Sequence, residues 1–98
     1  MILTIGTLLA LMVGAAVVTL TVITYKKIRD YLKQKRLLKN SSTRFVALHK
    51  AGDYETINIG IWDTEANSVS DPIILKGKAT DDETRHYLPA EEVILLDL

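Results

Sequence analysis

The chain has 98 residues, enough for one small domain, and its 12 basic and 12 acidic residues give a net charge of zero. It has no cysteine, which excludes a disulfide framework and thiolate chemistry. The charges are segregated, because residues 1–25 carry none, residues 26–43 carry a net +6 and residues 44–98 carry a net −6. This division predicts three segments with these boundaries, each in different surroundings.

The first segment predicts a single transmembrane helix. Residues 2–24 are uncharged and include twelve Ile, Leu or Val residues. As a helix they would extend roughly 34 Å at 1.5 Å per residue, against a hydrocarbon core about 30 Å thick. Basic residues follow at once, which places the amino terminus outside and the C-terminal domain in the cytoplasm. The alternative is a cleaved signal peptide, with Gly14 and Ala16 resembling a small-x-small cleavage site.

Small residues recur every fourth position within this predicted helix. Gly6, Ala10 and Gly14 would line one face of it. Small side chains let a second membrane helix approach closely, so these residues are candidates for helix packing against a second copy or another membrane subunit. The alternative is that Gly and Ala are simply common in membrane helices.

The basic segment predicts a helix over residues 26–40 that continues out of the membrane, followed by a short linker to residue 43. Lys26, Lys27, Arg29 and Lys33 are candidate membrane-surface residues that contact anionic lipid. Two alternatives are that the charges only fix topology, or that they dock on an acidic partner. Nucleic acid is not expected, because no aromatic residues alternate with the basic ones.

Residues 44–98 predict a small acidic, mostly-β domain. Short strands are expected at 44–50, 54–62, 73–75 and 93–98, separated by turns and polar loops. The segment 87–93 resembles the hydrophobic-Pro-x-x-x-Val closure of SH3-like barrels. The expected fold is therefore an SH3-like barrel or a curled antiparallel sheet, without the peptide-binding aromatic motifs of SH3 domains.

Residues suited to chemistry are scarce. His49 and His86 are the only histidines, and no short ligand spacing joins them to Asp53 or Glu91. The acidic run at 81–83 lacks the alternating oxygen ligands of a calcium loop. We therefore expect no catalytic residue, metal, cofactor or small-molecule substrate.

Tyr54 and Trp62, at the two ends of one expected strand, are candidate partner-contact residues, although both could instead cover the end of the core. The sequence favours a non-enzymatic, single-pass accessory or assembly subunit of a larger membrane complex. Two alternatives remain. One is a self-associating small membrane protein, such as a pore or a phage-type lysis factor, and the other is a membrane-tethered regulatory module.

Overall fold

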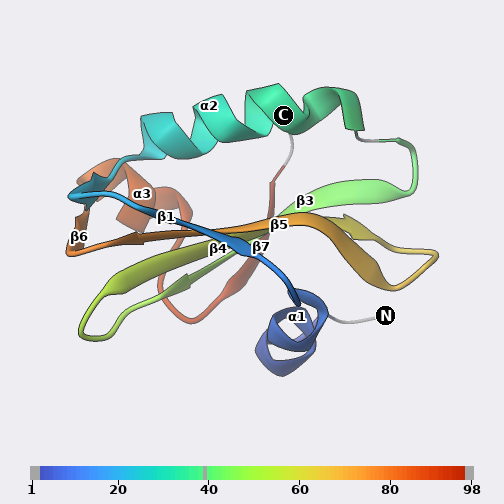
Figure 1. The fold of residues 1–98 in the computed structure, drawn as a ribbon, viewed down its shortest axis with the longest axis horizontal. Helices are drawn as coiled ribbons and strands as arrows, with labels where there is room; N and C mark the ends of the chain where they lie inside the picture. The colour runs from blue at the N-terminus through green and yellow to red at the C-terminus, as the bar shows by residue number, and fades with distance from the viewer. Residues whose placement is uncertain (1–2, 39, 97–98) are drawn as a thin grey trace.

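The computed structural model describes residues 3–38 and 40–96, which form a five-stranded mixed sheet with a helix against each face (Figure 1). Helix α1 (Ile5–Leu11) lies against one face and the longer helix α2 (Tyr25–Lys35) crosses the other. The remaining elements are β1 (Ala16–Thr19), β2 (Val22–Ile23), the 3-10 turn η1 (Arg36–Leu38), β3 (Thr43–Lys50), β4 (Glu55–Asp63), β5 (Ser68–Gly77), β6 (Ala79–Thr80), α3 (Asp82–Tyr87) and β7 (Val93–Leu96).

The strands of the main sheet follow the order β1-β5-β4-β3-β7. Three consecutive strands, β3, β4 and β5, form an antiparallel meander, and β7 returns antiparallel to β3. Strand β1 pairs parallel with β5, so that Val18 lies beside Leu75. Strands β2 and β6 form a separate two-residue parallel pair. The first and last parts of the chain therefore form the two edges of the main sheet.

The larger core lies between α2 and the sheet. Ile28 and Leu32, one helical turn apart, are buried and pack over the strands. Strand β4 contributes Ile57, Ile59 and Ile61 to this side, as its period of two requires. The amphipathic character of α2 is thus satisfied by protein, with its charged side chains facing outward.

A smaller core lies on the opposite face, beneath α1. Leu8 and Met12 of the α1 region pack against Val46, Leu48 and Trp62. Strand β3 therefore contributes alternate residues to both cores, which explains why nearly all of it is buried.

The transmembrane helix predicted for residues 2–24 is wrong. Residues 3–24 contain α1, β1 and β2 instead, and no helix within residues 3–38 and 40–96 is long and apolar enough to cross a membrane. The single-pass placement, with the amino terminus outside and a cytoplasmic C-terminal domain, is corrected with it. Apolar residues that we assigned to lipid are shared between two protein cores and an exposed edge strand.

Local sequence explains why the apolar stretch is divided. Helix α1 begins after Thr4, whose side chain accepts a hydrogen bond from the Thr7 amide, and it ends before Gly14, which has a positive φ of 79°. The β-branched residues at 17–19 and 21–24 then favour extended backbone. Thr24 begins α2 by accepting a hydrogen bond from the Lys27 amide.

The basic segment does contain a helix, α2, but this helix packs on the sheet instead of leading away from a membrane. Strands lie close to all four expected positions in residues 44–96. The SH3-like barrel or curled antiparallel sheet is nevertheless wrong, because the sheet is open, is completed by parallel β1 and is covered by helices. The segment 87–93 connects α3 to β7.

Candidate functional site: the β1 edge

Strand β1 is an exposed edge of the main sheet. In the part of the chain that the structure describes, β5 is its only neighbour in the sheet. All four residues of β1 are exposed, with Val17 at 58% and Val18 at 39%. Edge strands of globular proteins are normally shortened, covered or charged, because an open edge can pair with another chain. Strand β1 is short, but it is uncharged and three of its four side chains are apolar.

The outward-facing backbone groups of β1 follow from its pairing with β5. The amide of Leu20 donates to the Lys76 carbonyl at 2.7 Å, so the backbone of Leu20 faces β5. Backbone direction alternates along a strand, so Val18 also faces β5. Val17 and Thr19 therefore direct their N–H and C=O groups away from the sheet, where an additional strand would receive them.

The opposite edge of the sheet has a different character. Strand β7 follows directly on Glu91 and Glu92, and both carboxylates are exposed. Charges beside an edge disfavour further pairing. Strand β7 exposes only Leu95 of its four residues, whereas all four residues of β1 are exposed, so β1 is the more open of the two edges.

A groove of about 290 Å³ lies between β1 and α2. Its apolar lining comes from Val18, Leu20, Ile73 and Leu75. One face of α2 forms the remaining lining, with residues at the spacing of consecutive helical turns: Lys27, Asp30, Tyr31 and Gln34. The groove thus combines an apolar surface with a rim that holds one cation and one anion.

The rim is fixed in place by polar contacts. The Lys26 ammonium donates to the Asp30 carboxylate at 3.0 Å, and this hydrogen bond holds the pKa of Asp30 below its usual value. The Tyr31 hydroxyl donates to the Asp71 carbonyl at 2.9 Å. Burial raises the pKa of Tyr31, and the Asp71 carboxylate raises it further. Helix α2 is therefore anchored to β5 beside the groove.

A second hollow, of about 280 Å³, lies near the end of β1. Thr19, Leu20, Thr21, Tyr54, Gly77 and Lys78 line it. Tyr54 is 50% exposed, and the Lys76 ammonium lies 4.5 Å from the centroid of its ring. Surfaces that can accept side chains therefore lie along β1 and at its end.

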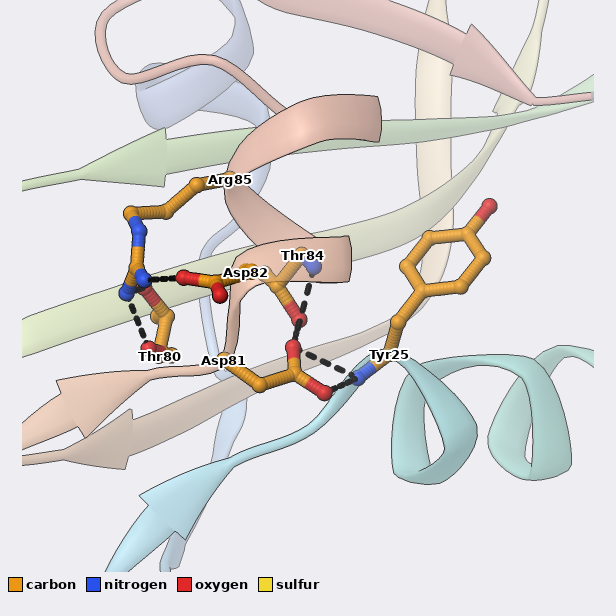
Figure 2. Close-up of polar contacts among 6 residues, drawn as sticks. All are labelled: Tyr25, Thr80, Asp81, Asp82, Thr84 and Arg85. Atoms are coloured by element: carbon orange, nitrogen blue, oxygen red, sulfur yellow. Dashed lines mark hydrogen bonds and ion pairs between the residues drawn. The ribbon is translucent and has the colours of Figure 1, made fainter.

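A polar cluster around Asp81 joins parts of the fold (Figure 2). The Asp81 carboxylate accepts hydrogen bonds from the Thr84 amide at 2.9 Å and from the Tyr25 amide at 3.2 Å, so it joins the amino ends of α3 and α2. Partial burial opposes ionisation, but the hydrogen bonds from Thr84 and Tyr25 outweigh it and keep the pKa of Asp81 below its usual value. Arg85 closes the cluster by contacting Asp82 and the Thr80 carbonyl.

Buried His49 also serves the fold. Its Nδ1 lies 2.9 Å from the Leu88 carbonyl and its Nε2 lies 3.4 Å from a Glu55 carboxylate oxygen. The Glu91 amide donates to the His49 carbonyl at 2.7 Å. His49 therefore ties β3 to the connection between α3 and β7, whereas His86 lies exposed on α3 beside the ring of Tyr87. No cluster of three metal-ligating side chains occurs within residues 3–38 and 40–96.

The structure does not bring the predicted helix-packing residues together on one helix. Gly6 and Ala10 are exposed on α1, whereas Gly14 lies in the turn beyond its end. The partner-contact candidates are also separated, because Tyr54 is half exposed beside the second hollow while Trp62 is only 6% exposed and packs in the core beneath α1. The predicted lipid-contacting residues Lys26, Lys27, Arg29 and Lys33 are all exposed on α2, and lipid contact stays a prediction.

The candidate site that sequence reasoning missed is β1 itself. Residues 16–19 were assigned to the interior of a membrane helix, so their role at a sheet edge was hidden. The available signal was the β-branched run that begins at Val17, combined with Gly14 upstream of it.

Comparisons with known proteins give no match for this chain. No family model, no curated protein and no solved structure is significantly similar to it.

Proposed function

We propose that the protein is a non-enzymatic binding subunit that takes up a strand of a partner polypeptide along β1. The observation that carries this proposal is an edge strand whose four uncharged residues are all exposed. An added strand would hydrogen-bond to the outward backbone groups of Val17 and Thr19. Strand addition of this kind gives affinity through the main chain, largely independently of the partner's sequence.

The groove beneath α2 supplies selectivity in this proposal. Alternate side chains of an added strand point to the same face of the sheet. Those on the α2 side would lie over the apolar surface formed by Val18 and Ile73, with Lys27 and Gln34 at the rim. The groove therefore favours a partner with small apolar residues at alternate positions and polar residues beside them.

The proposal assigns binding, not catalysis, to this site. Asp30 is the carboxylate at the groove, and the hydrogen bond from Lys26 favours its ionised form. A general base at neutral pH needs a pKa tuned towards 7, which is the opposite direction. Asp30 is therefore suited to orienting a bound chain by charge.

Photocrosslinking inside cells tests the proposal. A photoreactive phenylalanine analogue replaces Val17, and the matched control carries it at Asp53, which is exposed in the β3–β4 turn. We expect a covalent polypeptide adduct from position 17 and none from position 53. The adduct must disappear when Thr19→Pro is added, because proline removes the outward N–H at that position while leaving the hydrogen bonds to β5 intact.

Two results would contradict strand capture. One is the absence of any polypeptide adduct from position 17, and the other is an adduct that persists with Thr19→Pro. Circular dichroism of the purified Thr19→Pro variant is the check that this variant is folded. Leu20→Pro provides the contrasting variant, because it removes the internal hydrogen bond to Lys76 and should destabilise the domain.

A further inference from the structure

We propose that the strand that pairs with β1 is β1 of a second copy of this chain, antiparallel across a two-fold axis, with Val18 facing Val18 of that copy. This inference rests on the proposed function and names its partner. The product is one continuous ten-stranded sheet, in which both α2 helices cover the same face. A two-fold axis perpendicular to the sheet is the symmetry that produces this arrangement.

The register follows from the backbone of β1. In such a pair, the residue at the two-fold axis lies opposite the same residue of the second copy, and the residues on either side of it pair symmetrically. With Val18 at the axis, Val17 pairs with Thr19 of the second copy, and both residues have outward backbone groups. Each pair exchanges two hydrogen bonds, so every outward group within β1 is used. Placing Val17 at the axis would instead pair Thr19 with Ala15, which lies outside β1.

The extent of the exposed apolar surface favours a folded copy over a short peptide. Val13, before β1, is 83% exposed, and Val22, after it, is 44% exposed. A four-residue strand added to β1 would reach neither of them. Because the two strands run antiparallel, the end of β1 that follows Val13 in one copy lies beside the end that precedes Val22 in the other. Exposed apolar residues therefore flank the strand at both ends, where a folded second copy can cover them.

The rim that faces β1 holds one basic and one acidic residue, Lys27 and Asp30, and the Lys26 ammonium also donates to the Asp30 carboxylate. A second copy therefore meets charges of both signs at this rim, with a small basic excess. The exposed basic residues Arg29 and Lys33 lie on the other flank of α2, Arg36 follows directly after the helix, and none of the three lines the groove. Pairing two β1 edges therefore avoids bringing the basic flanks together.

Single-cysteine variants test the partner and the register together, because the native chain has no cysteine. In the proposed register, the two Val18→Cys residues form a non-hydrogen-bonded pair with Cα atoms about 4.5 Å apart, within disulfide range. Val17→Cys is the matched control. It would lie diagonal to its copy, about 7–8 Å away and beyond easy bridging, although Val17 is the more exposed residue.

We expect Val18→Cys to form a covalent dimer under mild oxidation and Val17→Cys to fail. We also expect the unmodified chain to sediment with twice its single-chain mass, and Thr19→Pro to sediment with half of that. Faster crosslinking of Val17→Cys would overturn the register. A chain that sediments as a single copy up to millimolar concentration would overturn the second-copy partner. In that case, a photocrosslinked adduct from position 17 to a different polypeptide would still support the proposed function.

Discussion

Replacing Asp81 by alanine should loosen both helices that its carboxylate joins. The variant loses the amino-terminal cap of α3, which is worth about 1 kcal/mol and lies within a range of roughly 0.5–2 kcal/mol. It also loses the hydrogen bond to the Tyr25 amide, worth about 1 kcal/mol more. The expected loss in the free energy of unfolding is therefore about 2 kcal/mol, or about 10 °C in Tm for a domain of this size.

Thermal and urea unfolding followed by circular dichroism measure this loss. Asp82→Ala is the matched control, because the Asp82 carboxylate is exposed and contacts only the side chain of Arg85. We expect Asp82→Ala to change the free energy of unfolding by less than about 0.5 kcal/mol. Equal effects of the two substitutions would refute the role of Asp81 in joining α2 to α3.

The effect of Asp81 also has a defined pH dependence. Its pKa in the folded protein lies below the ordinary value of 3.8, so ionised Asp81 stabilises the fold at neutral pH. This stabilisation is complete above the ordinary pKa and is lost as the pH falls through the lower folded value. Asp81→Asn keeps an oxygen that can cap α3, so it should cost less than Asp81→Ala and should lack this acidic loss. The stability gap between native protein and Asp81→Asn should therefore narrow in acid, and a constant gap would contradict the assignment.

Two further substitutions, each with a control substitution, test the packing. Gly60→Ala should destabilise the domain by about 1–3 kcal/mol, because an added Cβ would overlap a methyl group of the Val69 side chain, and urea unfolding measures the change. Gly6→Ala is its control, since the added methyl meets nothing within 4 Å and should stabilise α1 by about 0.5–1 kcal/mol. Leu32→Ala should lower the free energy of unfolding by about 2–5 kcal/mol, because this side chain of α2 is buried against the sheet. Lys33 is exposed on the same helix, so Lys33→Ala should lower it by less than about 0.5 kcal/mol. Equal, small effects at positions 32 and 33 would contradict the packing of α2 on the sheet.

Much of the C-terminal half could be predicted from its sequence. Ile57, Ile59 and Ile61 alternate with smaller or polar residues, and β4 places all three in the core beneath α2. The period of two identified the strand, but it could not show how many strands the sheet contains. The strand that this prediction lacked, β1, lies far from residues 44–98 in the sequence. The local pattern therefore favoured a barrel formed by residues 44–98 alone.

The amino-terminal half could not be predicted by hydrophobicity alone, because lipid and a protein core make similar demands on side chains. Length was the misleading quantity, since a run of 23 uncharged, mostly apolar residues is as long as a membrane span. Gly14 and the β-branched residues after it were the local signals for division. These signals did not decide the prediction, because Val and Thr are also tolerated within membrane helices. The candidate site was missed for the same reason, since Val17 and Val18 can be recognised as an edge strand only when the stretch is not read as one helix.

The parallel pairing of β1 with β5 has a consequence for biosynthesis. Val18 leaves the ribosome long before Leu75, its neighbour in the sheet 57 positions further along the chain. Until β5 is synthesised, the uncharged residues that precede α2 have no sheet to join, and closing so long a loop slows folding. We therefore expect the nascent chain to expose this uncharged, mostly apolar segment during most of its translation. Chaperones, or rapid release from the ribosome, would then be needed to prevent the segment from associating with other chains before the sheet forms.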